Sequence, residues 1–313
     1  MKKQGGIWLM VALALLLALP MAAQAEMYGE VYLGGVAGVN TPIDGNFSGS
    51  IHTGGKNKWD DTYSGSFSNS GHLKPAVQGG VKLGTWFVRE GTLGFDYPNW
   101  MKYFGFYLDF KVHRLVYERN SGSGTITGGG SASGTLEVPI WYGRYSYAET
   151  LSGNGNSTFT SEGLAPTLSF MFAGRYGLLP DPEVPFGRLQ PYLAVGPGIM
   201  FISQYTKIGM VGNLQGVRDL NDPHNPQSQA FGRGFNTAAK DSDHTVAVCL
   251  AVDTGVRYMA FQNVSIDLFF NYRFAKPSLS ATFVDPVNGS GHSVSWNPTY
   301  HLLSGNLGVA YHF

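Results

Sequence analysis

The sequence lacks the features that stabilise most small exported domains and most helical membrane proteins. Cys249 is the single cysteine among 313 residues, so an intramolecular disulfide is excluded. Charged residues make up 13% of the chain, about half the share found in typical globular proteins. After residue 25 the longest apolar run, Val246–Val252, is far shorter than the roughly 18 residues that indicate a membrane-spanning helix. Disulfide scaffolds and helical membrane bundles are therefore excluded.

Motifs for nucleotides, metals and nucleic acids are also missing. No phosphate-binding loop or complete dinucleotide fingerprint occurs, and the eight histidines are scattered. Asp60-Asp61 and Asp241-Ser242-Asp243 lack the spacing of a calcium-binding loop. Basic and acidic residues number 21 each, so there is no basic surplus to favour nucleic acid. We therefore expect no cofactor, no metal and no nucleic-acid partner.

The first 25 residues are typical of a cleaved secretory signal peptide. Lys2 and Lys3 precede an apolar stretch at 7–19, and Ala23-Gln24-Ala25 is a small-x-small cleavage site. That apolar stretch is short for a membrane span, which needs about 20 residues. Ala23 and Ala25 are thus the predicted cleavage residues. Residues 26–313 form the mature chain, which we predict to be a single domain.

Glycine and aromatic residues are abundant, and they fall in segments that alternate between apolar and polar side chains. The chain has 43 glycines and 14% aromatic residues. The clearest segment, 103–113, sets three phenylalanines, a leucine and a valine against tyrosines, glycine and charged residues. Such alternation over about 9 to 11 residues is typical of the strands of a transmembrane barrel. Eight segments show it: 28–39, 77–87, 103–113, 167–176, 189–201, 246–258, 264–274 and 303–313.

Every charged residue in these eight segments lies on the polar face. A charge that faces lipid at mid-membrane costs about 2 to 4 kcal/mol, so a bilayer would enforce this segregation. The polar faces are also rich in Gly, Ala and Ser, which does not suit the solvent-facing side of a water-soluble sandwich. The pattern predicts an all-β fold: a closed antiparallel transmembrane β-barrel of eight strands around a narrow lumen.

Long and short connections alternate along the chain. The long ones are 40–76, 114–166, 202–245 and 275–302, and the shorter ones are 88–102, 178–188 and 259–263. This asymmetry predicts long extracellular loops, shorter periplasmic turns and periplasmic termini. Ten strands are the alternative if 136–147 enters the membrane, although we expect that segment to extend the fourth strand above the bilayer. Pro197 cannot donate to a ladder, so we expect a bulge or kink there.

The last segment, Leu303-Ser-Gly-Asn-Leu-Gly-Val-Ala-Tyr-His-Phe313, ends on an aromatic residue with another two positions before it. Tyr311 and Phe313 look like the C-terminal signal by which the barrel-assembly machinery recognises its substrates. With the signal peptide and the alternating strands, the chain resembles the eight-stranded outer-membrane β-barrel superfamily, in the manner of the OmpA transmembrane domain, OmpX and OmpW. The resemblance implies an integral outer-membrane protein in contact with outer-membrane lipids and lipopolysaccharide.

Nine charged residues are predicted to point into the lumen. Because buried charges need partners, we interpret them as an ion-pair plug that fixes strand register and blocks flow. Side chains just fill the interior of an eight-stranded barrel, which favours a plug. A polar pathway for small solutes, as in an OmpW-like channel, is the alternative. The nine residues are Glu30, Lys82, Asp109, Lys111, Arg175, Asp253, Arg257, Asp267 and Arg273.

The loops would then carry any specificity, either as a ligand-binding surface or as a purely structural one. Their aromatic residues are Tyr63, Phe67, Trp141, Tyr142, Tyr145, Tyr147, Phe159 and Tyr205. A lipid-modifying hydrolase is the enzymatic alternative. However, the spacings of His292-Ser293, His301 with Ser304, and Asp243-His244 do not establish a nucleophile within reach of a base. We therefore predict a monomeric, non-enzymatic barrel with a structural or surface-interaction role, its extracellular ligand unknown.

Overall fold

The computed structural model describes residues 26–38, 43–53, 57–69, 71–87, 98–138, 141–184, 186–221, 227–284 and 291–313. These residues form antiparallel β-strands and one short 3-10 helix, η2(Asn99–Tyr103). Across them, no helix is long and apolar enough to cross a membrane. The predicted signal peptide, with Ala23 and Ala25, lies outside the described residues.

Eight strands form a ring in which each strand pairs with two antiparallel neighbours. The order is β1-β4-β5-β7-β8-β9-β10-β13, and β13 pairs again with β1 from Tyr28↔His312 to Gly38↔Leu302. The eight predicted segments supply these strands, so the predicted number is confirmed. The bounds are β1(Glu26–Gly38), β4(Ala76–Trp86), β5(Phe104–Val138), β7(Thr167–Arg175), β8(Leu189–Asn221), β9(Gln227–Met259), β10(Val264–Ala275) and β13(Tyr300–His312).

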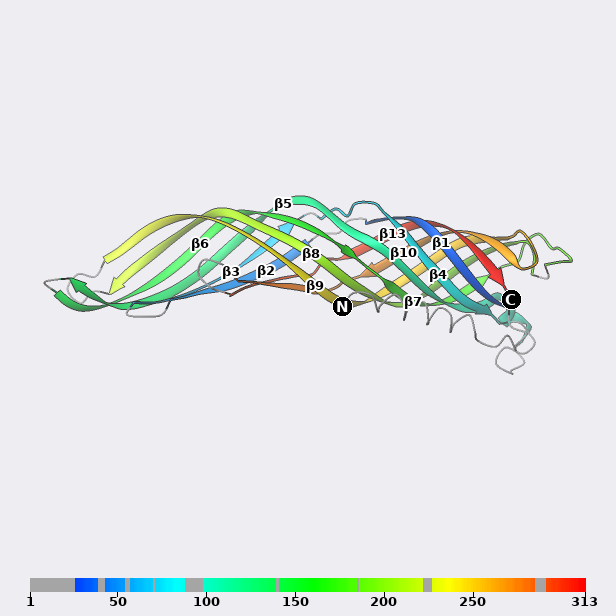
Figure 1. Ribbon diagram of the computed structural model, residues 1–313, viewed down its shortest axis with the longest axis horizontal. Coiled ribbons are helices and arrows are strands. Elements are labelled where there is room, and N and C mark those ends of the chain that lie inside the picture. The colour runs from blue at the N-terminus through cyan, green and yellow to red at the C-terminus, as the bar shows by residue number, and fades with distance from the viewer. Residues whose placement is uncertain are drawn as a thin grey trace, which may run out of the picture.

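The connections predicted as long loops are mostly strand, which corrects that prediction. β5, β8 and β9 are 35, 33 and 33 residues long and continue well past the ring. Five more strands join them in the order β11-β12-β2-β3-β5-β6-β8-β9, so segment 136–147 lies beyond the ring. Figure 1 shows this extension reaching away from the ring end that holds the C-terminus. The added strands are β2(Ile43–Thr53), β3(Asn57–Asn69), β6(Trp141–Leu164), β11(Leu279–Val284) and β12(Gly291–Trp296).

The extension is itself almost a ring of eight strands, and its one seam lies between β9 and β11. Within the described residues no backbone ladder joins these two strands. Two carboxylates bridge the seam instead. Asp243 Oδ2 accepts a hydrogen bond from the Ser280 amide at 2.6 Å, and Asp241 Oδ2 accepts one from the Thr282 amide at 3.2 Å. The exposed edge of β11 is therefore covered by side chains rather than by a strand.

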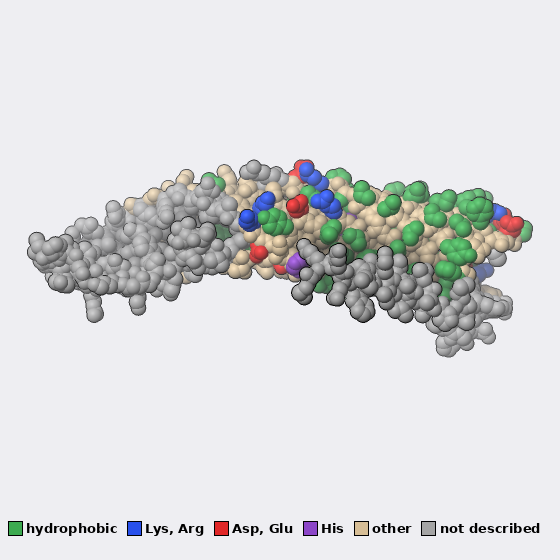
Figure 2. All heavy atoms as spheres, in the orientation of Figure 1, with side chains coloured by type: hydrophobic (Ala, Val, Ile, Leu, Met, Phe, Trp, Pro, Cys, Tyr) green, Lys and Arg blue, Asp and Glu red, His purple; other side chains and the backbone are tan. Residues whose placement is uncertain are grey.

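The inside and outside of the tube exchange character between the ring and the extension. On β5, Leu108 and Phe110 are exposed outside the ring, whereas Leu115 and Tyr117 are buried inside the extension. Figure 2 shows hydrophobic side chains spread over the ring end and charged side chains gathered near the middle of the molecule. Outward polar residues at this change of character are Lys74, Arg114, Glu118, Glu162, Lys207, His244 and Lys276. The ring is therefore polar inside and apolar outside, and the extension is the reverse.

Of the bulge or kink expected at Pro197, the bulge is absent, because β7 and β8 keep one register on both sides of it. Ser169↔Gly198 and Phe172↔Val195 keep the same register on either side of it, and pairing is interrupted between them. In the pairing of β8 with β9, Pro197 stays in register opposite Leu250. The missing amide donor costs β7 and β8 some local pairing without an inserted residue.

Candidate functional site: the charged lumen

All nine charged residues predicted to face the lumen lie inside the ring, and none is more than 4% exposed. They come from six strands, β1, β4, β5, β7, β9 and β10. The structure adds Glu26, whose carboxylate accepts two hydrogen bonds from Arg175 near the C-terminal end of the ring. Five cations therefore face five anions. Glu26 shares the alternation of Tyr28 and Glu30, and that is the sequence signal that could have identified it.

A chain of ion pairs crosses the middle of the lumen. Glu30 Oε1 lies 3.3 Å from Lys82 Nζ, and Glu30 Oε2 lies 2.9 Å from Arg257 Nη2. The same Nη2 lies 3.1 Å from Asp267 Oδ2. Each charge in this chain contacts one of opposite sign, which is what buried charges require. The chain ties β1, β4, β9 and β10 together across the interior.

Aromatic rings surround Lys82 at the centre of this chain. Its Nζ lies 3.2 Å from the centroid of Phe269 and 5.4 to 5.6 Å from the rings of Tyr32, Tyr107 and Tyr192. The tyrosine hydroxyls donate to carboxylates: Tyr32 to Asp109 at 2.6 Å, Tyr107 to Asp253 at 2.7 Å and Tyr192 to Asp267 at 3.1 Å. The rings thus fill the space between charges while their hydroxyls satisfy the anions.

Arg273 differs from the other lumen cations. Among the described residues no carboxylate lies within ion-pair distance of it, although its side chain is fully buried. Its guanidinium donates instead to Asn271 Oδ1 at 3.1 Å, Thr167 Oγ1 at 3.0 Å and Gln78 Oε1 at 3.1 Å. Neutral acceptors on three strands therefore hold this charge at the extension side of the network.

Cation stacking closes the end of the ring that carries the C-terminus. The Arg175 guanidinium lies 4.2 Å from the ring centroids of both Trp86 and Phe186.

In the turn between β7 and β8, a hydrogen bond of 2.6 Å from Arg188 to Asp181 holds the pKa of that carboxyl below its usual value. The stabilisation from this pair is present above the ordinary pKa of Asp181 and disappears as pH falls through the lowered value. The two side chains are 27% and 22% exposed, so water screens the pair and its effect on stability is small.

The charged groups of the lumen expose very little surface to water. A continuous water-filled path would leave accessible surface on the charged groups beside it, but Asp109, Lys111, Asp253, Asp267 and Arg273 have none. The other four predicted lumen charges are at most 4% exposed, whereas the side chain of Glu26 at the end of the ring is 25% exposed. Chemically, the network can neutralise charge and fix the register of the strands.

A serine, a histidine and a carboxylate near the same end are connected as in a hydrolase triad. Ser265 Oγ and His312 Nε2 are 2.9 Å apart, and His312 Nδ1 lies 3.6 Å from Glu26 Oε1. Ser265 has no accessible surface, and Glu26 already accepts two hydrogen bonds from Arg175. A substrate carbonyl cannot reach such a hydroxyl, so the geometry supports structural rather than nucleophilic use.

The pairs considered from sequence do not assemble a second constellation. His301 Nδ1 shares a hydrogen bond with the Tyr272 hydroxyl at 2.8 Å, whereas Ser304 lies on the opposite, inward face of β13. Asp243 Oδ1 accepts from the His244 amide, and the His292 side chain lies outside the described residues. In the described part of the chain, no group of three or more His, Cys, Asp or Glu could hold a metal.

Two of the aromatic residues predicted as surface anchors are core residues instead. Phe67 and Phe159 are 3% and 1% exposed and pack inside the extension, because its alternation turns apolar residues inward. Tyr205 is half-buried on the outside, and the side chains of the other five lie outside the described residues. Tyr311 and Phe313 are exposed at the end of β13 with ring centroids 5.1 Å apart. Their role as an assembly signal stays a prediction.

Comparison with known proteins returns structural similarity without a family. No protein-family model and no curated sequence matches the chain. The outer membrane protein OprG from Pseudomonas aeruginosa is 12% identical, with 93% of this chain and 99% of that one covered and a TM-score of 0.31. The outer membrane protease OmpT from Escherichia coli is 11% identical, with 95% and 99% covered and a TM-score of 0.23. Ail of Yersinia pestis, in complex with the heparin analogue sucrose octasulfate, is 9% identical, with 88% and 99% covered and a TM-score of 0.14. At these TM-scores the similarities carry no argument about activity or ligand.

Proposed function

We propose that this chain is a monomeric integral outer-membrane protein whose eight-stranded ring spans the bilayer as a closed, sealed barrel. It acts through its extracellular extension, in envelope structure or surface interaction, and not through catalysis or transport. In this proposal the ring end that carries the C-terminus faces the periplasm. The surrounding lipids and lipopolysaccharide are its constant partners, and the barrel-assembly machinery inserts it.

The outer surface of the ring supports a lipid environment. Exposed apolar residues cover it from Ile266 to Phe274 on β10, which spans about 20 Å along the barrel axis for a tilted strand. That height is close to the roughly 25 Å apolar band of outer-membrane barrels. Beyond this band the outward residues become polar, as required where the strands enter water. Soluble proteins rarely leave so large an apolar surface uncovered.

The burial of the charged network is the observation that supports this proposal. A transporter needs a path, and an enzyme needs an accessible reactive group. In this proposal the ion-pair chain around Arg257 blocks the path, and the buried Ser265 does not act as a nucleophile. The surface that remains free to meet other molecules in water is the outside of the extension.

Single-channel recording of the refolded mature protein in planar bilayers tests this proposal. We expect a silent wild type, because the charged side chains at the centre of the lumen expose almost no surface to water. Arg257→Ala should leak and favour cations, since it leaves Glu30 and Asp267 short of positive partners. Arg114→Ala is the matched control: it removes an arginine from an exposed pair with Glu162 outside the tube and should stay silent. Steady, ion-selective current through the wild type would replace this proposal with a small-solute channel.

A further inference from the structure

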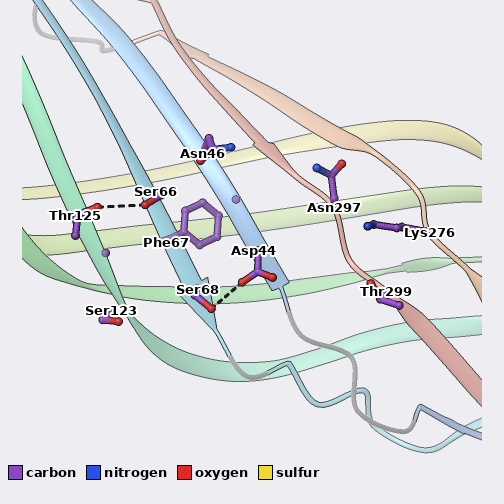
Figure 3. Close-up of a pocket in the computed structure, with 12 residues that line it drawn as sticks. Asp44, Asn46, Ser66, Phe67, Ser68, Ser123, Thr125, Lys276, Asn297 and Thr299 are labelled. Carbon is purple, nitrogen blue, oxygen red and sulfur yellow. Dashed lines mark hydrogen bonds between the residues drawn. The ribbon is translucent and has the colours of Figure 1, made fainter.

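A polar groove of about 520 Å³ lies on the outside of the extension where three strands meet two connections. Asp44 and Asn46 of β2, Ser66 and Ser68 of β3, and Ser123 and Thr125 of β5 form one wall. The other wall consists of Lys276 after β10 and of Asn297 and Thr299 between β12 and β13. Figure 3 shows Asp44 between the β3 hydroxyls and the ammonium of Lys276. Polar groups from five segments thus converge on one hollow.

Strand register places the hydroxyls and amides of the groove wall in continuous rows. One row runs Ser295, Asn46, Ser66, Thr125, Asn154 and Asn213 across six neighbouring strands, all of them exposed. Its members are uncharged, and each can donate as well as accept a hydrogen bond. Neighbouring strands are about 4.8 Å apart, so the row presents polar groups at regular short intervals. The groove lies over the part of this row on β2, β3 and β5.

Several groups in the groove are already oriented for binding. The Ser68 hydroxyl donates to Asp44 Oδ1 at 2.7 Å, and the Ser66 and Thr125 hydroxyls are 3.1 Å apart. These contacts fix short side chains that have little rotamer entropy to lose on binding. Lys276 is exposed, and no ion pair holds its ammonium among the described residues. Among the described residues, the groove therefore offers one carboxylate, one cation without an ion-pair partner and many neutral donors and acceptors.

The groove lies at the edge of the apolar band that borders the extension. Lys276 comes two residues after Phe274, the last outward apolar residue of β10. Groups at this height meet the headgroup layer of the proposed membrane. A molecule rich in hydroxyls with an occasional acidic group matches both the walls and the position.

We propose that this groove binds a pyranose oligosaccharide, with Asp44 and Asn46 bound to sugar hydroxyls and Lys276 paired with a single carboxylate or phosphate. The assignment rests on the proposed function, because it needs the extension to stand outside the bilayer. Sugars of this class occur both in the surrounding glycolipid and on the surfaces of other cells. The neutral rows and Asp44 do not favour a polysulfated chain, which needs a cluster of cations.

Saturation-transfer NMR of the full mature protein in deuterated detergent tests the assignment. The probes are the core oligosaccharide released from lipopolysaccharide by mild acid, lacto-N-neotetraose as a cell-surface glycan, and a sulfated dextran fragment. We expect the wild type to give a saccharide signal. Asn46→Ala should lower the affinity for the saccharide about tenfold, because one well-placed hydrogen bond is lost. Lys276→Ala should lower the affinity only for probes that carry an acidic group. Asn154→Ala, in the same row but outside the groove, should stay within about twofold of wild type.

Each outcome has a distinct meaning. Preference for the core oligosaccharide identifies the glycolipid as the source, and preference for lacto-N-neotetraose identifies another cell. Absence of signal with every saccharide, equal losses in Asn46→Ala and Asn154→Ala, or binding of the sulfated fragment alone would overturn the assignment. Heat-modifiable gel mobility shows whether each variant is folded. If the wild type is silent in bilayers but binds no sugar, only the groove assignment is wrong. If the wild type conducts, the proposed function is wrong.

Discussion

Arg257 and Arg273 are both buried in the lumen, yet their partners differ in kind. Arg257 contacts two carboxylates, and Arg273 contacts only neutral acceptors among the described residues. Removal of one partner from a buried ion pair leaves an uncompensated charge, whereas removal of a charge from neutral acceptors does not. Burial alone therefore does not predict which of the two arginines contributes more to the free energy of unfolding.

Methionine in place of each arginine measures this difference. We expect Arg257→Met to lower the free energy of unfolding by about 3 to 5 kcal/mol, because Asp267 loses its cation. Arg273→Met should cost about 1 to 3 kcal/mol, the penalty for unsatisfied neutral groups. Urea unfolding in lipid vesicles gives both values. The triple variant Arg257→Met, Glu30→Gln, Asp267→Asn should recover much of the loss. Equal costs for the two arginines would contradict this ranking.

At the scale of elements, the strands of the ring are visible in the sequence and those of the extension are not. In the proposed membrane-spanning ring, contact with lipid would require every other residue to be large and apolar, and 103–113 and 264–274 alternate clearly. In the extension, β3 and the part of β5 beyond the ring are rich in Gly, Ser and Thr, a composition shared with loops. Ladder pairing with long neighbouring strands makes them strands, and sequence windows do not contain that information.

The same limit explains the errors at single residues. The polar neighbours of Phe67 favour a surface anchor, but its ring is one of the inward groups of β3. The predicted segment begins at Tyr28 and therefore does not include Glu26, two residues before it on the same face. Conversely, the inward direction of all nine predicted lumen charges follows from alternation alone, whereas their partners depend on strand order.

The seam between β9 and β11 makes a separate prediction at this scale. If the two carboxylates cover the edge of β11, the double variant Asp241→Ala, Asp243→Ala should speed amide exchange at Ser280 and Thr282 about tenfold. The Ala281 amide is an internal control, because its residue pairs with Val294 on the far side of β11. NMR-detected hydrogen exchange resolves the three amides. Unchanged exchange at Ser280 and Thr282 would mean that the seam is closed by other contacts.

At the scale of the whole molecule, one tube passes through two environments. The ring is apolar outside and charged inside, and the extension has its apolar core inside and hydroxyls outside. Long strands such as β8 carry both patterns in succession, with Phe201 exposed outside the ring and Ile202 buried inside the extension. The level at which the pattern reverses is therefore the predicted edge of the bilayer.

Spin-label accessibility along the outside of the tube tests that edge most directly. Labels at Leu108→Cys and Leu268→Cys report the ring, and labels at Glu118→Cys and Lys207→Cys report the extension, all in a Cys249→Ala background. In lipid vesicles, the ring labels should be relaxed mainly by oxygen, which concentrates in lipid. The extension labels should be relaxed mainly by a water-soluble nickel chelate. Ring labels as accessible to nickel as the Glu118→Cys label would show that the ring does not face lipid, and the membrane-spanning assignment would be wrong.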